Sequence, residues 1–263
     1  MRTQLLLATI TSIGCLSHFA LAEIKTETVE YKDGATVLQG IQSYDDTIKG
    51  KRPGVLIVHD WMGVTEHTKA IAEEMASLGY VAFAADIYGK GVRPADTTAA
   101  SAEAGKYKGD RPLLRKRATA GLEELQKHSL TDSKHIAAIG FCFGGTTVLE
   151  LARSGAKIQG VVSFHGGLDS PTPADGKNIK SKILVLHGAD DPFVKPADIA
   201  AFQEELRQGG ADWQMMYYGD AVHSFTQKKA GTDKSKGAAY NEPAARRSWQ
   251  AMKTFFGELF TGK

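Results

Sequence analysis

The chain contains very little cysteine: only Cys15 and Cys142 occur among its 263 residues. Cys15 lies in an N-terminal segment with the features of a signal peptide, so a processed chain would keep Cys142 alone. A single cysteine cannot form an internal disulfide bond, which excludes a fold held together by disulfides. The simplest role for a lone cysteine is inert packing in the core, and a redox-sensing thiol would need a partner from another molecule. The residues around Cys142 must therefore decide its role.

Long apolar runs and an excess of one charge are also absent. After residue 22 no stretch of about 18 residues is apolar, so the sequence predicts no membrane-spanning helix. Lys and Arg total 32 against 30 Asp and Glu. Neither a basic arm nor an aromatic and basic stripe is present, which disfavours nucleic acid as a partner. His59 and His67 have no further ligand at a suitable spacing, so we expect no metal and no cofactor.

The first 22 residues predict export. Residues 5–16 are mostly apolar but too short to span a bilayer, and residues 20–22 (Ala-Leu-Ala) have the pattern of a cleavage site. A lipoprotein signal that uses Cys15 fits less well, because residues 12–14 (Ser-Ile-Gly) match that motif poorly. We therefore expect a signal peptide at 1–22, one domain at 23–263, and a periplasmic or secreted protein.

Strand-like and helix-like segments alternate along this domain. Short apolar runs predict buried strands, and apolar residues three and four apart predict amphipathic helices. Strands are expected at residues 24–31, 36–41, 55–58, 80–85, 135–139, 159–164, 182–186 and 213–218, and helices at 68–78, 113–128, 146–153, 196–208 and 243–260. This alternation predicts an α/β fold with a mostly parallel, doubly wound sheet and helices on both faces. Residues 87–111, rich in Gly, Pro, Ala and Lys, are interpreted as an irregular excursion over the active face.

The segment Gly140-Phe141-Cys142-Phe143-Gly144-Gly145 lies between a predicted strand and a predicted helix. A nucleophile on such a turn, with glycine two residues before and two residues after it, is typical of the nucleophile elbow of an α/β-hydrolase. The strand and the helix nearly touch there, so a side chain at either glycine would collide. The pattern predicts a thiol nucleophile and an α/β-hydrolase fold.

An α/β-hydrolase has its nucleophile, acid and histidine in that order along the chain. Asp190 and Asp191 follow the strand at 182–186, and His223 is the one histidine after them. The residues themselves leave the choice between the two aspartates open, because either could cap a turn. His165 also follows a strand but precedes the acid, so we expect it to line the pocket or to pack, and we interpret His187 as a structural histidine at a strand end.

These residues suggest a mechanism. His223 would take the thiol proton while the aspartate orients its imidazole, and the helix N-terminus beside Cys142 would favour the thiolate. The thiolate would attack an ester or lactone carbonyl. Two N–H groups would bind the resulting oxyanion, one from Phe143 and one from the loop near Trp61.

Three motifs together resemble the dienelactone hydrolase family of α/β-hydrolases, in particular its exported bacterial members. They are the elbow at 140–145, Asp191-Pro192-Phe193-Val194 and Val222-His223-Ser224-Phe225. The resemblance covers residues 55–223 and the terminal helix. It implies cleavage of a carboxymethylenebutenolide-like lactone, with Asp191 as the acid and the Trp61 N–H as the second oxyanion donor.

The sequence departs from that family at three positions. Asp60 stands where a glutamate activates the cysteine, and Lys90 and Gln227 stand where arginines bind the substrate carboxylate. Lysine lacks the bidentate fork of arginine, and glutamine has no charge. We therefore expect a hydrolase of small esters or lactones, active as a monomer or a homodimer. The alternative is a binding protein on a hydrolase fold, with little or no catalysis.

Overall fold

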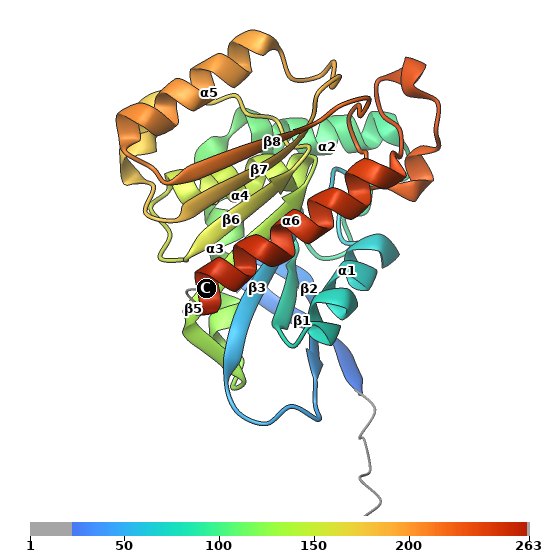
Figure 1. The fold of residues 1–263 in the computed structure, drawn as a ribbon. Helices are drawn as coiled ribbons and strands as arrows, with labels where there is room; N and C mark the ends of the chain where they lie inside the picture. The colour runs from blue at the N-terminus through green and yellow to red at the C-terminus, as the bar shows by residue number, and fades with distance from the viewer. Residues whose placement is uncertain (1–22, 262–263) are drawn as a thin grey trace, which may run out of the picture.

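One eight-stranded sheet forms the centre of the structure, a computed structural model that describes residues 23–261 (Figure 1). The predicted signal peptide at 1–22 lies outside the described residues. The strands are β1 (Ile24–Asp33), β2 (Thr36–Asp45), β3 (Arg52–Val58), β4 (Val81–Ala85), β5 (Thr131–Phe141), β6 (Gly160–Phe164), β7 (Lys182–Gly188) and β8 (Trp213–Tyr218). The α-helices are α1 (Glu66–Ser77), α2 (Thr97–Gly109), α3 (Arg111–Lys127), α4 (Phe143–Arg153), α5 (Pro196–Gly209) and α6 (Glu242–Thr261). Short 3₁₀ turns occur at η1 (Pro173–Asn178), η2 (Lys228–Ala230) and η3 (Lys234–Lys236).

The strand order is β1-β2-β4-β3-β5-β6-β7-β8. The hairpin β1–β2 and the β2–β4 pair are antiparallel, and every other neighbouring pair is parallel. The carboxyl ends of β3 to β8 therefore point to one edge, where α/β folds place their sites. The predicted fold class is confirmed.

Both faces of the sheet are covered because β3 is apolar at consecutive positions. Leu56 and Val58 pack into one core with α3, α4 and α5, while Val55 and Ile57 pack into a second core with α1 and α6. A strand's side chains alternate between faces, so a continuous apolar run needs helices on both sides. Figure 1 shows α1 and α6 in front of the sheet and α3 and α4 behind it.

Local signals fix several helix ends. The Thr65 amide donates to the Thr68 hydroxyl at the start of α1, and the Asp110 carboxylate accepts from the Leu113 amide at the start of α3. Gly210, with φ of 68°, ends α5 in the left-handed conformation that glycine adopts readily. The caps at Thr65 and Asp110 explain why α1 and α3 each begin two residues earlier than the apolar spacing predicted.

The interpretation of residues 87–111 as irregular was wrong over the second half, which forms α2. Its buried positions are Ala100, Ala104 and Tyr107, so two of its three packing residues are alanines. Alanine has a high helix propensity but gives a weak apolar signal, and the periodicity of this helix is therefore inconspicuous in the sequence. The prediction that this segment covers the active face is confirmed, because α2 contributes to the cavity described below.

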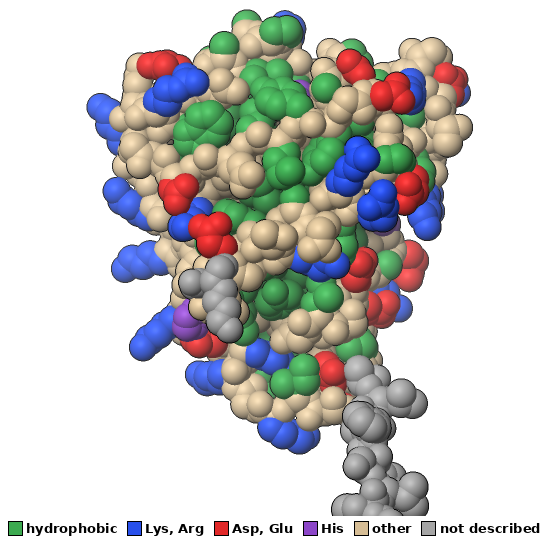
Figure 2. All heavy atoms as spheres, in the orientation of Figure 1, with side chains coloured by type: hydrophobic (Ala, Val, Ile, Leu, Met, Phe, Trp, Pro, Cys, Tyr) green, Lys and Arg blue, Asp and Glu red, His purple; other side chains and the backbone are tan. Residues whose placement is uncertain are grey.

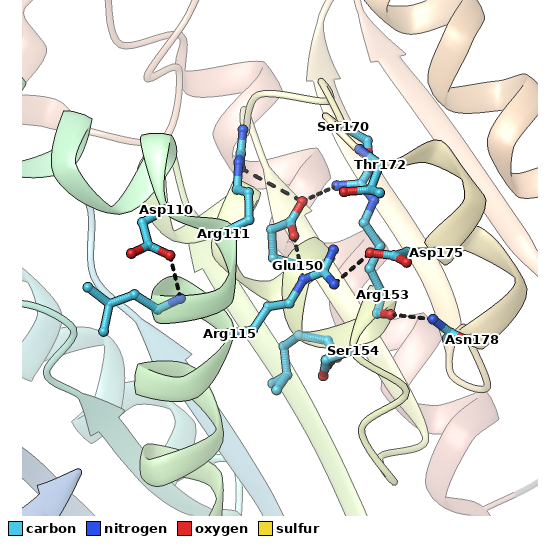
Figure 3. Close-up of polar contacts among 12 residues, drawn as sticks. Asp110, Arg111, Arg115, Glu150, Arg153, Ser154, Ser170, Thr172, Asp175 and Asn178 are labelled. Carbon is cyan, nitrogen blue, oxygen red and sulfur yellow. Dashed lines mark hydrogen bonds and ion pairs between the residues drawn. The ribbon is translucent and has the colours of Figure 1, made fainter. Parts of the chain in front are cut away.

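A buried ion-pair network anchors the far end of α4 (Figure 3). The Arg153 side chain is fully buried and makes two hydrogen bonds to Glu205 on α5, at 2.8 and 2.7 Å, and one to Glu150 at 2.9 Å. Arg115 on α3 joins the network through Glu150 and Asp175 at 2.7 and 2.6 Å. Buried charges are tolerated when each is paired. Because the pairs join side chains of α4 to α3 and α5, they fix the position of α4 relative to those two helices.

The surface carries mixed charge. On the face viewed in Figure 2, basic and acidic side chains are interspersed over α6 and its neighbours. Within residues 23–261, no helix is both long enough and apolar enough to cross a membrane.

Candidate active site

Cys142 occupies the turn between β5 and α4, as the sequence predicted. Its backbone has φ of 55° and ψ of −114°, a region that costs a non-glycine residue about 1–3 kcal/mol. The residue sits at the N-cap position of α4, where the helix dipole favours negative charge. The strained turn directs the thiol to the carboxyl edge of the sheet.

The glycines on either side of the turn are required by close backbone contact. A Cβ atom on Gly140 would lie 2.0 Å from the carbonyl oxygen of Gly144, and one on Gly144 would lie 2.2 Å from that of Val58. Real Cβ atoms do not approach oxygen so closely. The steric argument made from the sequence pattern is therefore confirmed.

The structure brings Cys142, His223 and Asp191 into one chain of contacts. The Nε2 atom of His223 lies 3.0 Å from the Cys142 Sγ, and its Nδ1 lies 2.8 Å from the Asp191 Oδ2. Asp191 follows β7 and His223 follows β8, so three strand ends supply the three side chains. These distances suit a nucleophile, a base and an orienting carboxylate.

The two candidate aspartates differ in their surroundings. The Asp191 side chain is fully buried and also accepts from the Phe193 amide at 2.9 Å. Asp190 is exposed, and its amide donates to the Ala221 carbonyl. The structure therefore places Asp191, and not Asp190, against His223.

His223 holds its proton strongly. Burial would lower the pKa of its imidazole, but the hydrogen bonds to Asp191 and Cys142 outweigh burial and raise that pKa to about 10. An imidazolium beside the sulfur stabilises the thiolate, which is the nucleophilic form of cysteine.

The two residues expected to bind an oxyanion lie close together. Phe143 is the first residue of α4, so its N–H has no acceptor within the helix. The Trp61 peptide is held by the Tyr88 hydroxyl, which donates to the Trp61 carbonyl at 3.1 Å. The Tyr88 ring also packs on the Phe143 ring, with centroids 5.4 Å apart. Trp61 and Phe143 both line the cavity above the thiol.

A cavity of about 650 Å³ opens over Cys142 and His223. Its walls include the apolar side chains of Trp61, Phe143, Phe193 and Val194, with Ala104 from α2. The volume suits a small molecule.

Two lysines that the sequence analysis did not identify add positive charge to this cavity. Lys108 at the end of α2 and Lys236 in η3 both line it, and no Asp or Glu of the described residues does. Lys108 forms no ion pair within the described part of the chain, and Lys236 lies 3.8 Å from the Asp233 carboxylate. Lysine-rich surface segments are common, so spacing alone could not have selected these two.

Asp60 and Gln227 lie together beside a second cavity, whereas Lys90 lies away from the main one. Asp60 accepts from the Gln227 amide at 2.9 Å, and both line a second cavity of about 620 Å³. Lys90 pairs with Glu30 on β1 and does not line the main cavity. The structure thus joins Asp60 to Gln227 but does not bring Lys90 to the site.

His165, His187 and His59 are buried strand-end residues. His165 contacts the backbone of Cys142, whereas the His187 ring packs against Tyr217 and the His59 ring against Tyr88. Over residues 23–261, no group of three His, Cys, Asp or Glu side chains is arranged to hold a metal ion.

The mostly parallel sheet and the strained thiol between β5 and α4 define an α/β-hydrolase. The model of the dienelactone hydrolase family matches residues 41–260, and the chain belongs to that family. A solved dienelactone hydrolase-like promiscuous phosphotriesterase from metagenomic libraries is 42% identical, covers 90% of this chain and 99% of its own, and superimposes with a TM-score of 0.85. A solved structure named m3DLH is 40% identical with the same coverage and a TM-score of 0.87.

A relative from Bradyrhizobium sp is named "Probable 2-oxo-3-(5-oxofuran-2-ylidene)propanoate lactonase". It is 26% identical over 82% of this chain and 88% of its own length. The family is one of hydrolases, so the alternative of a binding protein without catalysis has no support from these similarities.

Proposed function

We propose that the protein hydrolyses small carboxylic esters or lactones, with Cys142 as the nucleophile, His223 as the acid and base, and Asp191 as the group that orients His223. One observation carries this proposal: the His223 Nε2 lies 3.0 Å from the Sγ of Cys142 at the base of a cavity large enough for a small molecule. The lactonase name of the Bradyrhizobium relative supports a lactone among the substrates.

The proposed reaction has two stages. The Sγ of Cys142 attacks the carbonyl carbon, and the oxyanion is bound by the N–H groups of Phe143 and Trp61. His223 gives its proton to the leaving alkoxide as the C–O bond breaks, which leaves a thioester on Cys142. His223 then removes a proton from water, and the hydroxide attacks the thioester, which releases the acid and restores the Cys142 thiolate beside the protonated His223.

The cavity charge favours a substrate that is itself negatively charged away from its carbonyl. Lys108 and Lys236 are positive, and the lining lacks any carboxylate among the described residues. Both lysines are exposed, and an exposed charge contributes at most about 0.2–1 kcal/mol. The two lysines would bind the substrate's negative charge in place of the arginine that the family has at position 227, where Gln227 binds Asp60 instead.

Mono-p-nitrophenyl glutarate and p-nitrophenyl pentanoate, which differ mainly in a terminal carboxylate, test this proposal. We expect the protein to hydrolyse both, and the double variant Lys108→Ala/Lys236→Ala to lower the glutarate-to-pentanoate ratio of kcat/KM about tenfold at low salt. Lys106→Ala/Lys234→Ala removes the same charge from residues that pair with Glu103 and Asp220, and should leave the ratio unchanged. Absence of hydrolysis of both esters would contradict the proposed function, and an unchanged ratio in the lysine variant would contradict only the charge assignment.

The pH dependence of hydrolysis should reflect the raised pKa of His223. Because that pKa is about 10 in the folded protein, the imidazolium persists through neutral pH and is lost as the pH rises through about 10. For an ester with an alkyl alcohol as its leaving group, the value of kcat/KM should therefore fall above this pH, since the departing alkoxide loses its proton donor. Asp191→Asn removes a carboxylate that raises the His223 pKa, so the pH above which kcat/KM falls should be lower in this variant. If that pH does not change, the fall in kcat/KM reflects the titration of a group other than His223.

A second candidate reaction is phosphotriester hydrolysis. It is favoured by the 42% identity to a protein named as a promiscuous phosphotriesterase. The same thiol could attack a phosphorus centre, and p-nitrophenol release from diethyl p-nitrophenyl phosphate measures this activity beside the two esters.

We also propose that the protein is exported. The support is the N-terminal sequence itself, with its apolar segment and the Ala-Leu-Ala pattern at residues 20–22.

A further inference from the structure

His165, at the end of β6, is a second buried histidine beside the thiol, and the proposed mechanism does not use it. Its ring lies edge-to-face with that of His223, with centroids 5.3 Å apart. A second edge-to-face contact, at 5.1 Å, is made with Phe225. The side chain has no exposed surface, so both of its ring nitrogens need partners within the protein.

Both nitrogens have such partners. The backbone N–H of Cys142 is shared between the Phe164 carbonyl at 3.0 Å and the Nδ1 of His165 at 3.2 Å, and the Nε2 of His165 lies 2.8 Å from the Thr226 Oγ1. Because Nδ1 accepts, the ring proton of a neutral His165 is on Nε2, which donates to Thr226. The imidazole therefore connects the backbone of the thiol residue to the loop that carries His223.

This connection lies where two strands end in strained turns. Cys142 has φ of 55° and His165 has φ of 41°, both in the left-handed region that non-glycine residues seldom occupy. The strands β5 and β6 pair up to Phe141 and Phe164, directly before these two residues. The ring of His165 thus bridges two strained positions at the edge of the sheet.

A protonated His165 would break this arrangement. An Nδ1–H would face the N–H of Cys142, which places two donors against each other. Burial, followed by the positive charge of His223, holds the pKa of His165 well below its ordinary value, and His67 and His187 act in the same direction. His165 is therefore neutral while His223 carries the proton.

We propose that neutral His165 is a positioning residue for the ester hydrolysis proposed above: it holds the Cys142 amide through Nδ1, holds Thr226 through Nε2, and supports the ring of His223. Loss of these contacts would let the elbow and the imidazole shift relative to each other. Small displacements of reacting groups lower the rate strongly. This inference rests on the proposed function for its kinetic consequence.

The test compares His165→Phe, which keeps a buried ring without hydrogen bonds, with His165→Gln, whose amide can both accept and donate. We expect His165→Phe to lower kcat at least tenfold with KM changed less than threefold, and His165→Gln to recover part of that loss. Thr226→Val should lower kcat about threefold and should add nothing to His165→Phe, because both act through one hydrogen bond. The control is His187→Gln, a buried strand-end histidine on β7 that makes no hydrogen bond to Cys142, with a change below twofold.

The rate of Cys142 alkylation by iodoacetamide provides a readout that needs no ester turnover. It should fall about tenfold at pH 7 in His165→Phe and not in His187→Gln, because a displaced imidazolium stabilises the thiolate less. If His165→Phe does not fold, the kinetics and alkylation rate of Thr226→Val test the proposal, since this variant leaves the buried ring of His165 in place. Kinetics and alkylation in His165→Phe or Thr226→Val that match those of His187→Gln would overturn the proposal. If the alkylation rates of the variants differ as expected but the wild-type protein hydrolyses no ester, the positioning role of His165 stands and the proposed function is contradicted.

Discussion

Replacement of Cys142 by alanine is expected to lower kcat/KM for p-nitrophenyl esters by at least about 10⁴-fold, the largest effect on activity that the structure implies. Removal of a nucleophile from a set of groups that act together has losses of this size or greater. The loss corresponds to about 5 kcal/mol of transition-state stabilisation. Initial rates with p-nitrophenyl acetate, corrected for spontaneous hydrolysis, measure it.

The fold should survive this substitution. Cys142 is only partly buried at the base of an open cavity, so removal of the sulfur leaves no closed void in the core. Alanine keeps the same Cβ atom in the same strained backbone conformation. The free energy of unfolding in urea should therefore change by less than about 1 kcal/mol. Full turnover in a folded Cys142→Ala variant would exclude the thiol as the nucleophile.

Cys142→Ser provides a matched variant with a hydroxyl in place of the thiol. It should fold and hydrolyse esters poorly, because a hydroxyl gives up its proton less readily than a thiol and the site holds an imidazolium in the resting state. A serine variant as active as the wild type would show that the site functions as an ordinary serine hydrolase.

Gly144→Ala is expected to have the largest effect on stability, and the protein should fail to accumulate in soluble form. The new Cβ would lie 2.2 Å from the Val58 carbonyl oxygen and 2.6 Å from that of His59. Both contacts are with backbone at the end of β3, so relief requires α4 to move away from the sheet. The cost should exceed about 4 kcal/mol, which is a large part of the 5–15 kcal/mol that stabilises a typical domain.

Gly257→Ala is the control for this substitution. Gly257 lies in α6, and a Cβ there meets nothing within 4 Å. Alanine should therefore be neutral or stabilise the helix by about 0.5–1 kcal/mol. Urea unfolding and soluble yield compare the two variants. A folded Gly144→Ala protein destabilised by less than about 1 kcal/mol would contradict the steric argument.

Much of the fold could be predicted because its signals are local. The run at residues 55–58 is apolar at every position, which a strand shows only when both faces of its sheet are covered. The helix α2 was missed because alanines form most of its buried face, and a search for large apolar residues does not detect them. Local pattern thus identifies elements that pack through large side chains and misses those that pack through small ones.

The candidate site could be predicted only in part. Cys142 and His223 followed from motif and chain order, and Asp191 was indicated over Asp190 by family resemblance rather than by local pattern. Lys90 was expected at the site by the same resemblance, but it pairs with Glu30. A matching position in the chain does not fix where a long, flexible side chain lies.

The sequence by itself determined the alternation of strands and helices, the two glycines required at the elbow, and the order of nucleophile, acid and histidine. Each depends on backbone geometry within a few residues or on the chain order of strand ends. Only the tertiary structure decided that Lys108 and Lys236 share a cavity and that His165 joins Cys142 to Thr226. These contacts join segments far apart in the chain, and the packing of loops at the edge of the sheet, which leaves no periodic trace in the sequence, determines how they meet.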